Sequence, residues 1–199
     1  MESTWNNKVL SDMFGATEGT ALRIKQAALV VLGIAFLAVA AKIKVPMWPV
    51  PITMGTFAVL TIGAAYGARL GLVTIIGYMI VGALGFDVFA GSSAEKFGLT
   101  YMMGGTGGYL VGYVMATVAL GALAQRGWDR SVLWMALAML IGNVLIYVPG
   151  LAWLGQLYGW DKPILEWGLT PFLVGDALKL ALAALVLPAA WKLVGRARG

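Results

Sequence analysis

The sequence predicts an all-α membrane protein with six transmembrane helices and both termini in the cytoplasm. Hydrophobic residues make up 60% of the 199-residue chain and charged residues only 12%, whereas soluble domains contain about 45–50% and roughly 25%. The mean hydropathy of +0.85 agrees with this. So few charges cannot cover the surface of a soluble protein, and intrinsic disorder requires the opposite composition.

Long stretches without Asp, Glu, Lys or Arg locate the helices, because a helix that crosses the hydrocarbon core needs about 20 mostly apolar residues. We expect the second and third helices to be joined by a very short turn at 67–71. The fifth contains Pro149-Gly150, so we expect it to kink or break there. The six predicted helices span roughly residues 22–42, 52–69, 71–86, 105–125, 132–158 and 171–194.

The basic residues predict the orientation, because cytoplasmic loops carry an excess of Lys and Arg. With the N-terminus inside, nine lie on the cytoplasmic side and four outside. Residues 1–21 and 195–199 are then cytoplasmic tails, and 22–194 form the transmembrane domain of a multi-pass protein of the cytoplasmic (inner) membrane. The inner set is Lys8, Arg23, Lys25, Arg69, Arg126, Arg130, Lys192, Arg196 and Arg198; the outer set is Lys42, Lys44, Lys96 and Lys162.

The net charge of +5 follows from this asymmetry and fits the anionic inner leaflet of the bilayer. No stretch interleaves basic and aromatic residues as a nucleic-acid-binding surface does, so no nucleic acid is expected as a partner. The chain contains no Cys and no His, which excludes disulfides and leaves neither a cysteine nucleophile nor a histidine base. We therefore expect no catalytic residue, no metal site and no cofactor, and no enzyme activity in this chain.

The first predicted outer loop contains three prolines in six positions, Pro46, Pro49 and Pro51, with Trp48 between them. Proline fixes φ and biases the preceding residue toward extended geometry, so this segment is predicted to be a stiff extended strap. Two interpretations are equally open. It is either a helix stop with an interfacial tryptophan or a gating loop over an outward-facing cavity.

A glycine-rich segment begins the fourth helix, Gly104-Gly105-Thr106-Gly107-Gly108-Tyr109. It lacks the Lys of a Walker A loop, and no βαβ unit surrounds it as a dinucleotide fingerprint requires. The spacing of Gly104, Gly108 and Gly112 favours close helix packing. The alternative is a helix entrance where bare backbone amides meet a ligand.

Asp176 and Lys179 lie within the sixth predicted helix, where each charge costs about 2.5–3.5 kcal/mol on insertion scales. Their spacing of three residues places them on one helix face. A mutually neutralised structural pair is possible, but a function is favoured because apolar residues would support the helix more cheaply. Asn143, with Tyr147 one turn later, adds polar groups in the fifth helix. Together these groups suit a small, mostly apolar organic acid with polar N–H groups.

Five motifs in this order resemble the BioY family, the biotin-specific S components (substrate-binding subunits) of energy-coupling-factor (ECF) transporters. The resemblance runs from about Ala27 to the end of the sixth helix. The motifs are VPITMGTFAV at residues 50–59, VFAG at 88–91, GTGGYLVGY at 105–113, GNVLIY at 142–147 and PFLVGDALK at 171–179.

The resemblance implies biotin uptake by a six-helix, S-component-like bundle with an outward-facing biotin pocket. It also implies assembly with an ECF coupling membrane subunit and two ATP-binding cassette ATPases, which would supply the energy. The alternative from another class is a proton-linked secondary transporter of a small organic acid that uses Asp176. A membrane-embedded enzyme and a purely structural bundle fit less well. The candidate ligand-binding residues are Asp176, Lys179, Asn143, Tyr147, Thr106, Gly107, Gly108, Tyr109, Phe89 and Ser92.

Overall fold

A computed structural model describes residues 8–46, 48–93 and 97–198. Part of the predicted N-terminal tail (1–7), Lys96 of the outer basic set and the last residue of the C-terminal tail lie outside these residues. Within them, five helices are long and apolar enough to cross a membrane. These helices are α1 (Gly19–Lys42), α2 (Gly55–Ala83), α4 (Gly107–Gln125), α5 (Val132–Tyr158) and α7 (Leu173–Arg198).

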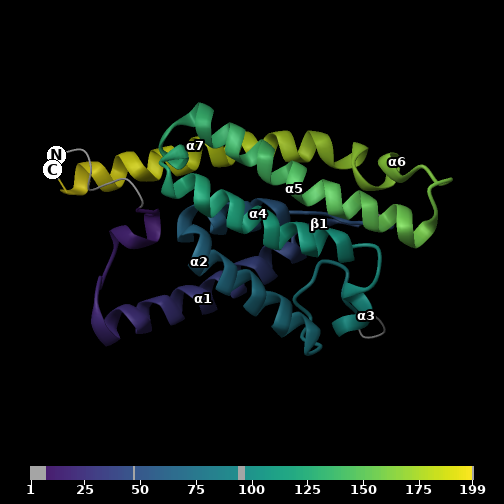
Figure 1. Cartoon of the computed structure of the whole chain (residues 1–199), viewed down its shortest axis with the longest axis horizontal. Helices are drawn as coiled ribbons and strands as arrows, with labels where there is room; N and C mark the ends of the chain where they lie inside the picture. Colours follow the sequence, from purple (N-terminus) through teal and green to yellow (C-terminus); the bar gives the residue numbers. More distant parts are fainter. Residues whose placement is uncertain (1–7, 47, 94–96, 199) are drawn as a thin grey trace.

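The long helices run between two ends of the molecule (Figure 1). The terminal end holds both chain termini, the 3-10 helix η1 (Leu10–Met13) and the 3-10 helix η2 (Trp128–Arg130). The opposite end, here called the hairpin end, holds the other short elements, which are the strands β1 (Lys44–Val45) and β2 (Ile52–Thr53), the helices α3 (Gly98–Met102) and α6 (Ile164–Gly168), and the 3-10 helix η3 (Thr170–Phe172).

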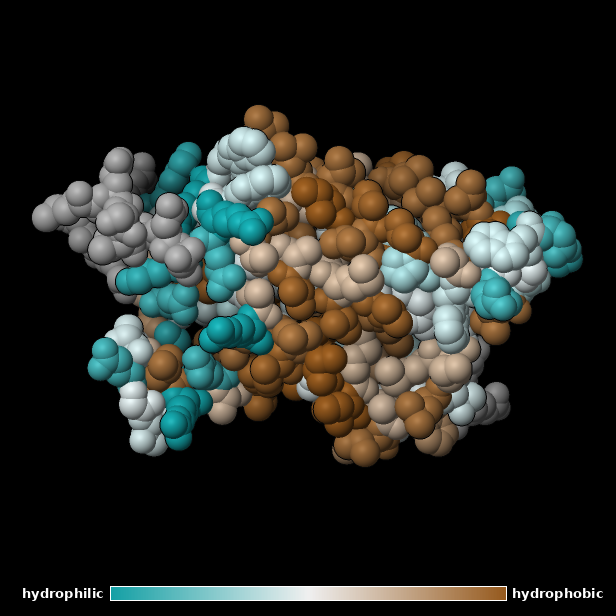
Figure 2. Space-filling view, viewed as in Figure 1, coloured by the Kyte–Doolittle hydropathy of each residue, from teal (hydrophilic) through white to brown (hydrophobic). Residues whose placement is uncertain are grey.

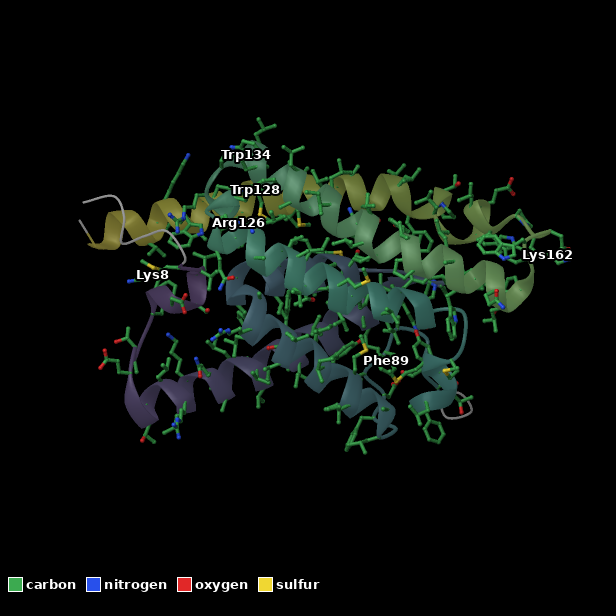
Figure 3. The ribbon with its side chains drawn as sticks, viewed as in Figure 1. Lys8, Phe89, Arg126, Trp128, Trp134 and Lys162 are labelled. Atoms are coloured by element: carbon green, nitrogen blue, oxygen red, sulfur yellow. The ribbon has the colours of Figure 1, made fainter. Side chains whose placement is uncertain are left out.

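The surface has the polarity of a membrane protein. Figure 2 shows a hydrophobic band around the middle and hydrophilic residues at both ends. Lys8 and Arg126 lie at the terminal end and Lys162 at the hairpin end (Figure 3). The predicted inner and outer basic residues that the figure labels therefore lie at opposite ends of the molecule.

The expected second and third helices form one element, α2, with a break at Gly67. Gly67 has φ +77° and ψ 172°, a conformation that glycine adopts without the steric penalty of a Cβ. The two halves fold back on each other at this point, because a Cβ built on Gly71 would lie 3.6 Å from the Gly63 Cα. In a straight helix those residues would be about 12 Å apart.

Helix α4 packs between α2 and α5 through glycines. A Cβ on Gly121 would lie 2.2 Å from the Ala68 backbone nitrogen, and one on Gly112 would lie 2.6 Å from the Ile146 Cα. Such close backbone approach is typical of membrane helices, whose association depends on dispersion contacts. Helix α5 continues through Pro149 as one helix, so of the expected kink or break the break is absent.

Candidate functional site

A cavity with an empty volume of about 600 Å³, open mouth included, lies at the hairpin end. It is formed by α2, α4, α5 and α7, together with the β1–β2 loop and the segment between α2 and α4. Five of the predicted site residues line it, namely Phe89, Thr106, Tyr109, Tyr147 and Lys179, and so does Pro51 of the predicted gating loop.

A buried ion pair closes one side of the cavity. The Lys179 Nζ donates to the Asp176 Oδ1 at 2.9 Å and to the Thr56 Oγ1 at 3.0 Å. The Thr56 hydroxyl donates in turn to Asp176 at 3.4 Å, and Tyr147 donates to the other carboxylate oxygen. Asp176 is 5% exposed and Lys179 8%. Each charge thus has a partner, which a buried ion pair needs to offset its desolvation.

Aromatic side chains form another part of the lining. The Phe89 ring stacks on the Tyr101 ring, with centroids 5.0 Å apart, and meets Tyr78 edge-on at 5.3 Å. Phe89 is 1% exposed. Its position is fixed from several directions, because the Lys42 Nζ donates to the Phe89 carbonyl at 2.8 Å and the Tyr78 hydroxyl to the Val88 carbonyl at 2.9 Å. The cavity that Lys179 lines therefore also has an aromatic lining suited to an apolar ring system.

The predicted strap is the loop of a small β-hairpin. Strands β1 and β2 pair antiparallel, with Lys44 opposite Thr53. The described residues between them, 46 and 48–51, are not helical, as the three prolines require. Val50 is buried and lines the cavity next to Pro51, so this loop forms part of the cavity wall.

Trp48 does not line the cavity. It is 66% exposed, and its ring packs edge-on against Tyr158 and Trp167, at centroid distances of 5.5 and 5.2 Å. Pro46 and Pro49 line a neighbouring cleft, together with Lys44 and Gly105. The four predicted gating residues therefore divide between the cavity, the cleft and an aromatic cluster on α5 and α6.

Three predicted polar residues, Asn143, Asp176 and Ser92, are not part of the cavity lining. Asn143, 9% exposed, lines an apolar groove between α5 and α7, which Asp176 and Tyr147 also line. Asp176 thus sits between this groove and the cavity, behind Lys179. Ser92 bonds to Asp87 and to the Phe89 carbonyl instead of lining the cavity.

The glycines at the start of α4 are packing residues in this structure. A Cβ on Gly107 would lie 2.3 Å from the Met102 carbonyl oxygen, and one on Gly108 would lie 2.2 Å from the Pro149 carbonyl oxygen. These contacts support the packing interpretation at both positions, and neither glycine lines the cavity. Thr106, just before the helix, is the member of the segment that lines the cavity beside Tyr109.

Sequence reasoning missed several lining residues. Thr53 and Thr56 belong to the 50–59 motif, which was recognised as a motif but not as a source of site residues. Tyr78, Tyr101 and Tyr113 also line the cavity. Aromatic residues near span ends ordinarily belong to the membrane interface, so no local signal marked them. The described residues contain no group of three or more acidic side chains that could hold a metal ion.

The fold and the site define a multi-pass membrane protein with a cavity at the hairpin end, lined by Lys179 and by aromatic side chains. The family model of the BioY family matches residues 13–196. The chain therefore belongs to the BioY family.

Named relatives agree. The chain is 37% identical over 165 residues to a probable biotin transporter BioY from Pyrococcus horikoshii, covering 83% of this chain and 95% of the relative. It is 32% identical over 152 residues to the biotin transporter BioY from Thermotoga maritima, covering 76% and 87%. Among solved structures, the S-component for biotin from an ECF-type ABC transporter matches with a TM-score of 0.73 at 19% identity, covering 88% of this chain and 95% of that one. This last likeness shows a common fold.

Proposed function

We propose that this chain binds biotin in the cavity at the hairpin end and serves as the substrate-binding membrane subunit of an ECF-type biotin transporter. Membership of the BioY family supports this proposal, as do the names of its relatives. The observation that carries it is the buried Lys179–Asp176 pair at a cavity that also has an aromatic lining. Biotin has complementary parts, an apolar bicyclic ring and chain with a polar ureido group and a carboxylate.

The geometry suggests different roles for Lys179 and Asp176. Lys179 lines the cavity, and its ammonium group can donate to a biotin oxygen. Asp176 lies behind it and accepts hydrogen bonds from Lys179, Thr56 and Tyr147. We propose that Asp176 holds Lys179 charged and oriented and that its free lone pairs accept ureido N–H bonds when biotin is bound.

Titration calorimetry on two variants tests the binding site. Asp176→Asn removes the charge that holds Lys179, and Lys179→Met removes the ammonium group while keeping an apolar stem. We expect at least tenfold weaker biotin binding for each, because hydrogen bonds to charged groups contribute about 1.5–3 kcal/mol. Lys192→Met, an exposed lysine on the same helix, is the matched control. Unchanged affinity in both site variants would disprove the assignment.

The family and the fold also support a wider arrangement. We propose that the two halves of α2 cross the bilayer separately, giving six crossings, with both termini in the cytoplasm and the cavity facing outward through the inner membrane. An ECF coupling subunit and two ATP-binding cassette ATPases would then supply the energy. Uptake into vesicles should require ATP and should not respond to an imposed proton gradient, which separates this scheme from a proton-linked carrier.

A further inference from the structure

A second cavity, with an empty volume of about 840 Å³, lies at the terminal end, opposite the proposed biotin site. It is enclosed by η1, the first turns of α1, and α2 on both sides of its break at Gly67. Figure 1 shows η1 and the start of α1 at this end, with α1 diverging from the rest of the bundle. Gln125 at the end of α4 completes the lining, so four elements build the cavity, far from the hairpin end.

The polar part of this cavity favours an anion. Lys25 and Arg69 line it, together with the neutral Gln26, Gln125 and Ser11. Arg69 is exposed, and the half-buried Lys25 uses one of its three N–H donors in a long bond of 3.4 Å to the Ala16 carbonyl. One carboxylate also lines the cavity, that of Asp12, and it accepts the Val9 backbone N–H at 3.0 Å. Two cations thus face one acid that is already hydrogen-bonded.

The remaining lining is apolar and leads toward the bilayer. Leu22, Leu29 and Val73 line the cavity. Val73 is 56% exposed, and further along α1 the side chains of Val31 and Leu32 are 65% and 63% exposed. The apolar part of the lining therefore adjoins exposed apolar side chains of α1 and α2. Such a lining suits an amphipathic ligand with an anionic head and a hydrocarbon tail.

We propose that this cavity binds the phosphate head group of an anionic phospholipid. Lys25 and Arg69 would hold the phosphodiester, and an acyl chain would lie over Leu29 and Val73. Basic pockets between membrane helices on the cytoplasmic side are suited to anionic lipid head groups. Lys25 lies six residues into α1, about 9 Å from its start, where a lysine can extend its ammonium group toward the head-group region.

Native mass spectrometry of the detergent-solubilised full chain tests this, with palmitoyl-oleoyl-phosphatidylglycerol and palmitoyl-oleoyl-phosphatidylcholine as the probes. We expect one tightly bound phosphatidylglycerol and weaker phosphatidylcholine binding. The variant Lys25→Gln with Arg69→Gln should bind phosphatidylglycerol about 25-fold more weakly, or about fivefold for each basic group near the lipid surface. The matched control, Arg126→Gln with Lys192→Gln, removes the same charge from the same end outside the cavity and should keep the affinity.

Four outcomes would overturn the proposal. An equal loss of phosphatidylglycerol affinity in both double variants would mean that general surface charge binds the lipid. Equal binding of the two lipids would mean that the anionic head group is not recognised. Displacement of the lipid by inorganic phosphate at comparable concentration would mean that the acyl chain contributes nothing to binding. Unchanged biotin affinity of the Lys25→Gln, Arg69→Gln variant shows that it is folded. Asp12→Asn, which removes the opposing charge, should tighten phosphatidylglycerol binding about threefold, and no change would place the head group elsewhere.

Discussion

The ammonium group of Lys42, in the last turn of α1, forms an ion pair with the carboxylate of Asp87, in the loop after α2. The same Nζ donates to the Phe89 carbonyl at 2.8 Å and to the Ser92 Oγ at 3.3 Å. This lysine therefore ties the loop that carries Phe89 to the end of α1. The ion pair also lowers the pKa of the Asp87 carboxyl, through its hydrogen bond from Lys42.

Lys42→Met should weaken biotin binding, although Lys42 does not line the cavity. Without its bonds to the loop, the aromatic lining at Phe89 loses one of its fixed points. We expect about tenfold weaker binding, since about 1.4 kcal/mol corresponds to tenfold and lost preorganisation reduces affinity. Titration calorimetry measures this, with Lys162→Met as control, because Lys162 pairs with Asp161 away from the cavity. Equal affinities in the two variants would mean that the loop holds Phe89 without Lys42.

The buried carboxyl of Asp129 should make the stability of the fold depend on pH. Its side chain is fully buried in η2, it accepts a hydrogen bond from the Trp191 Nε1, and the Arg130 guanidinium lies 4.5 Å from the centre of the Trp191 ring. Burial raises the Asp129 pKa from 3.8 to about 6, although the bond from Trp191 lowers it. The folded state thus favours the protonated form, and the free energy of unfolding should fall as the pH rises from about 4 to 6.

Asp129→Asn should abolish this pH dependence. Because a shift of one pKa unit corresponds to about 1.4 kcal/mol, the variant should be more stable than wild type at pH 7.5 by at most about 3 kcal/mol. Denaturation in detergent at pH 4.5 and 7.5 measures the difference, with the exposed Asp161→Asn as control. A variant that is less stable at pH 7.5 would show that the ionised carboxylate stabilises the fold.

The positions of the membrane helices could be predicted from the sequence, but their rotations about their own axes could not. Helix α5 begins and ends where its charge-free stretch predicts, and α1 begins three residues earlier than expected. Hydrocarbon requires long uninterrupted apolar runs, so the pattern is unambiguous. These helices are apolar on all sides, however, so nothing in the sequence indicates that Asn143 faces the groove between α5 and α7.

The charged residues of the site could be predicted, because burying a charge has a high cost. Lys179 and Asp176 are conspicuous in an apolar helix, and they form one buried pair. Tyr78, Tyr101 and Tyr113 come from three different helices and meet only after folding. Ser92 was predicted as a site residue but does not line the cavity. The Lys42–Asp87 pair, formed across 45 residues, binds the Ser92 side chain instead.

Substitution of the α4 glycines should destabilise the bundle. A Cβ on Gly112 would lie 2.6 Å from the Ile146 Cα and 2.8 Å from the Leu145 carbonyl oxygen, so backbone atoms would have to move. We expect Gly112→Ala to cost about 1–3 kcal/mol, as overpacking does. Thermal unfolding in detergent measures this. Gly195→Ala is the control, because its Cβ would have no neighbour within 4 Å and alanine is the better helix former. Equal melting temperatures for Gly112→Ala and wild type would contradict tight packing of α4 on α5.

The absence of cysteine from the chain allows the proposed six crossings to be tested with single cysteines. If each half of α2 crosses the bilayer, Arg69 at the turn faces the cytoplasm and Phe86, which is 62% exposed in the loop after α2, faces outward. A membrane-impermeant maleimide should then label Phe86→Cys in intact cells but label Arg69→Cys only after permeabilisation. Lys162→Cys and Lys192→Cys provide the outer and inner references. Labelling of positions 69 and 86 from the same side would mean that the second half of α2 does not cross, and a reversed pattern at all four positions would place both termini outside.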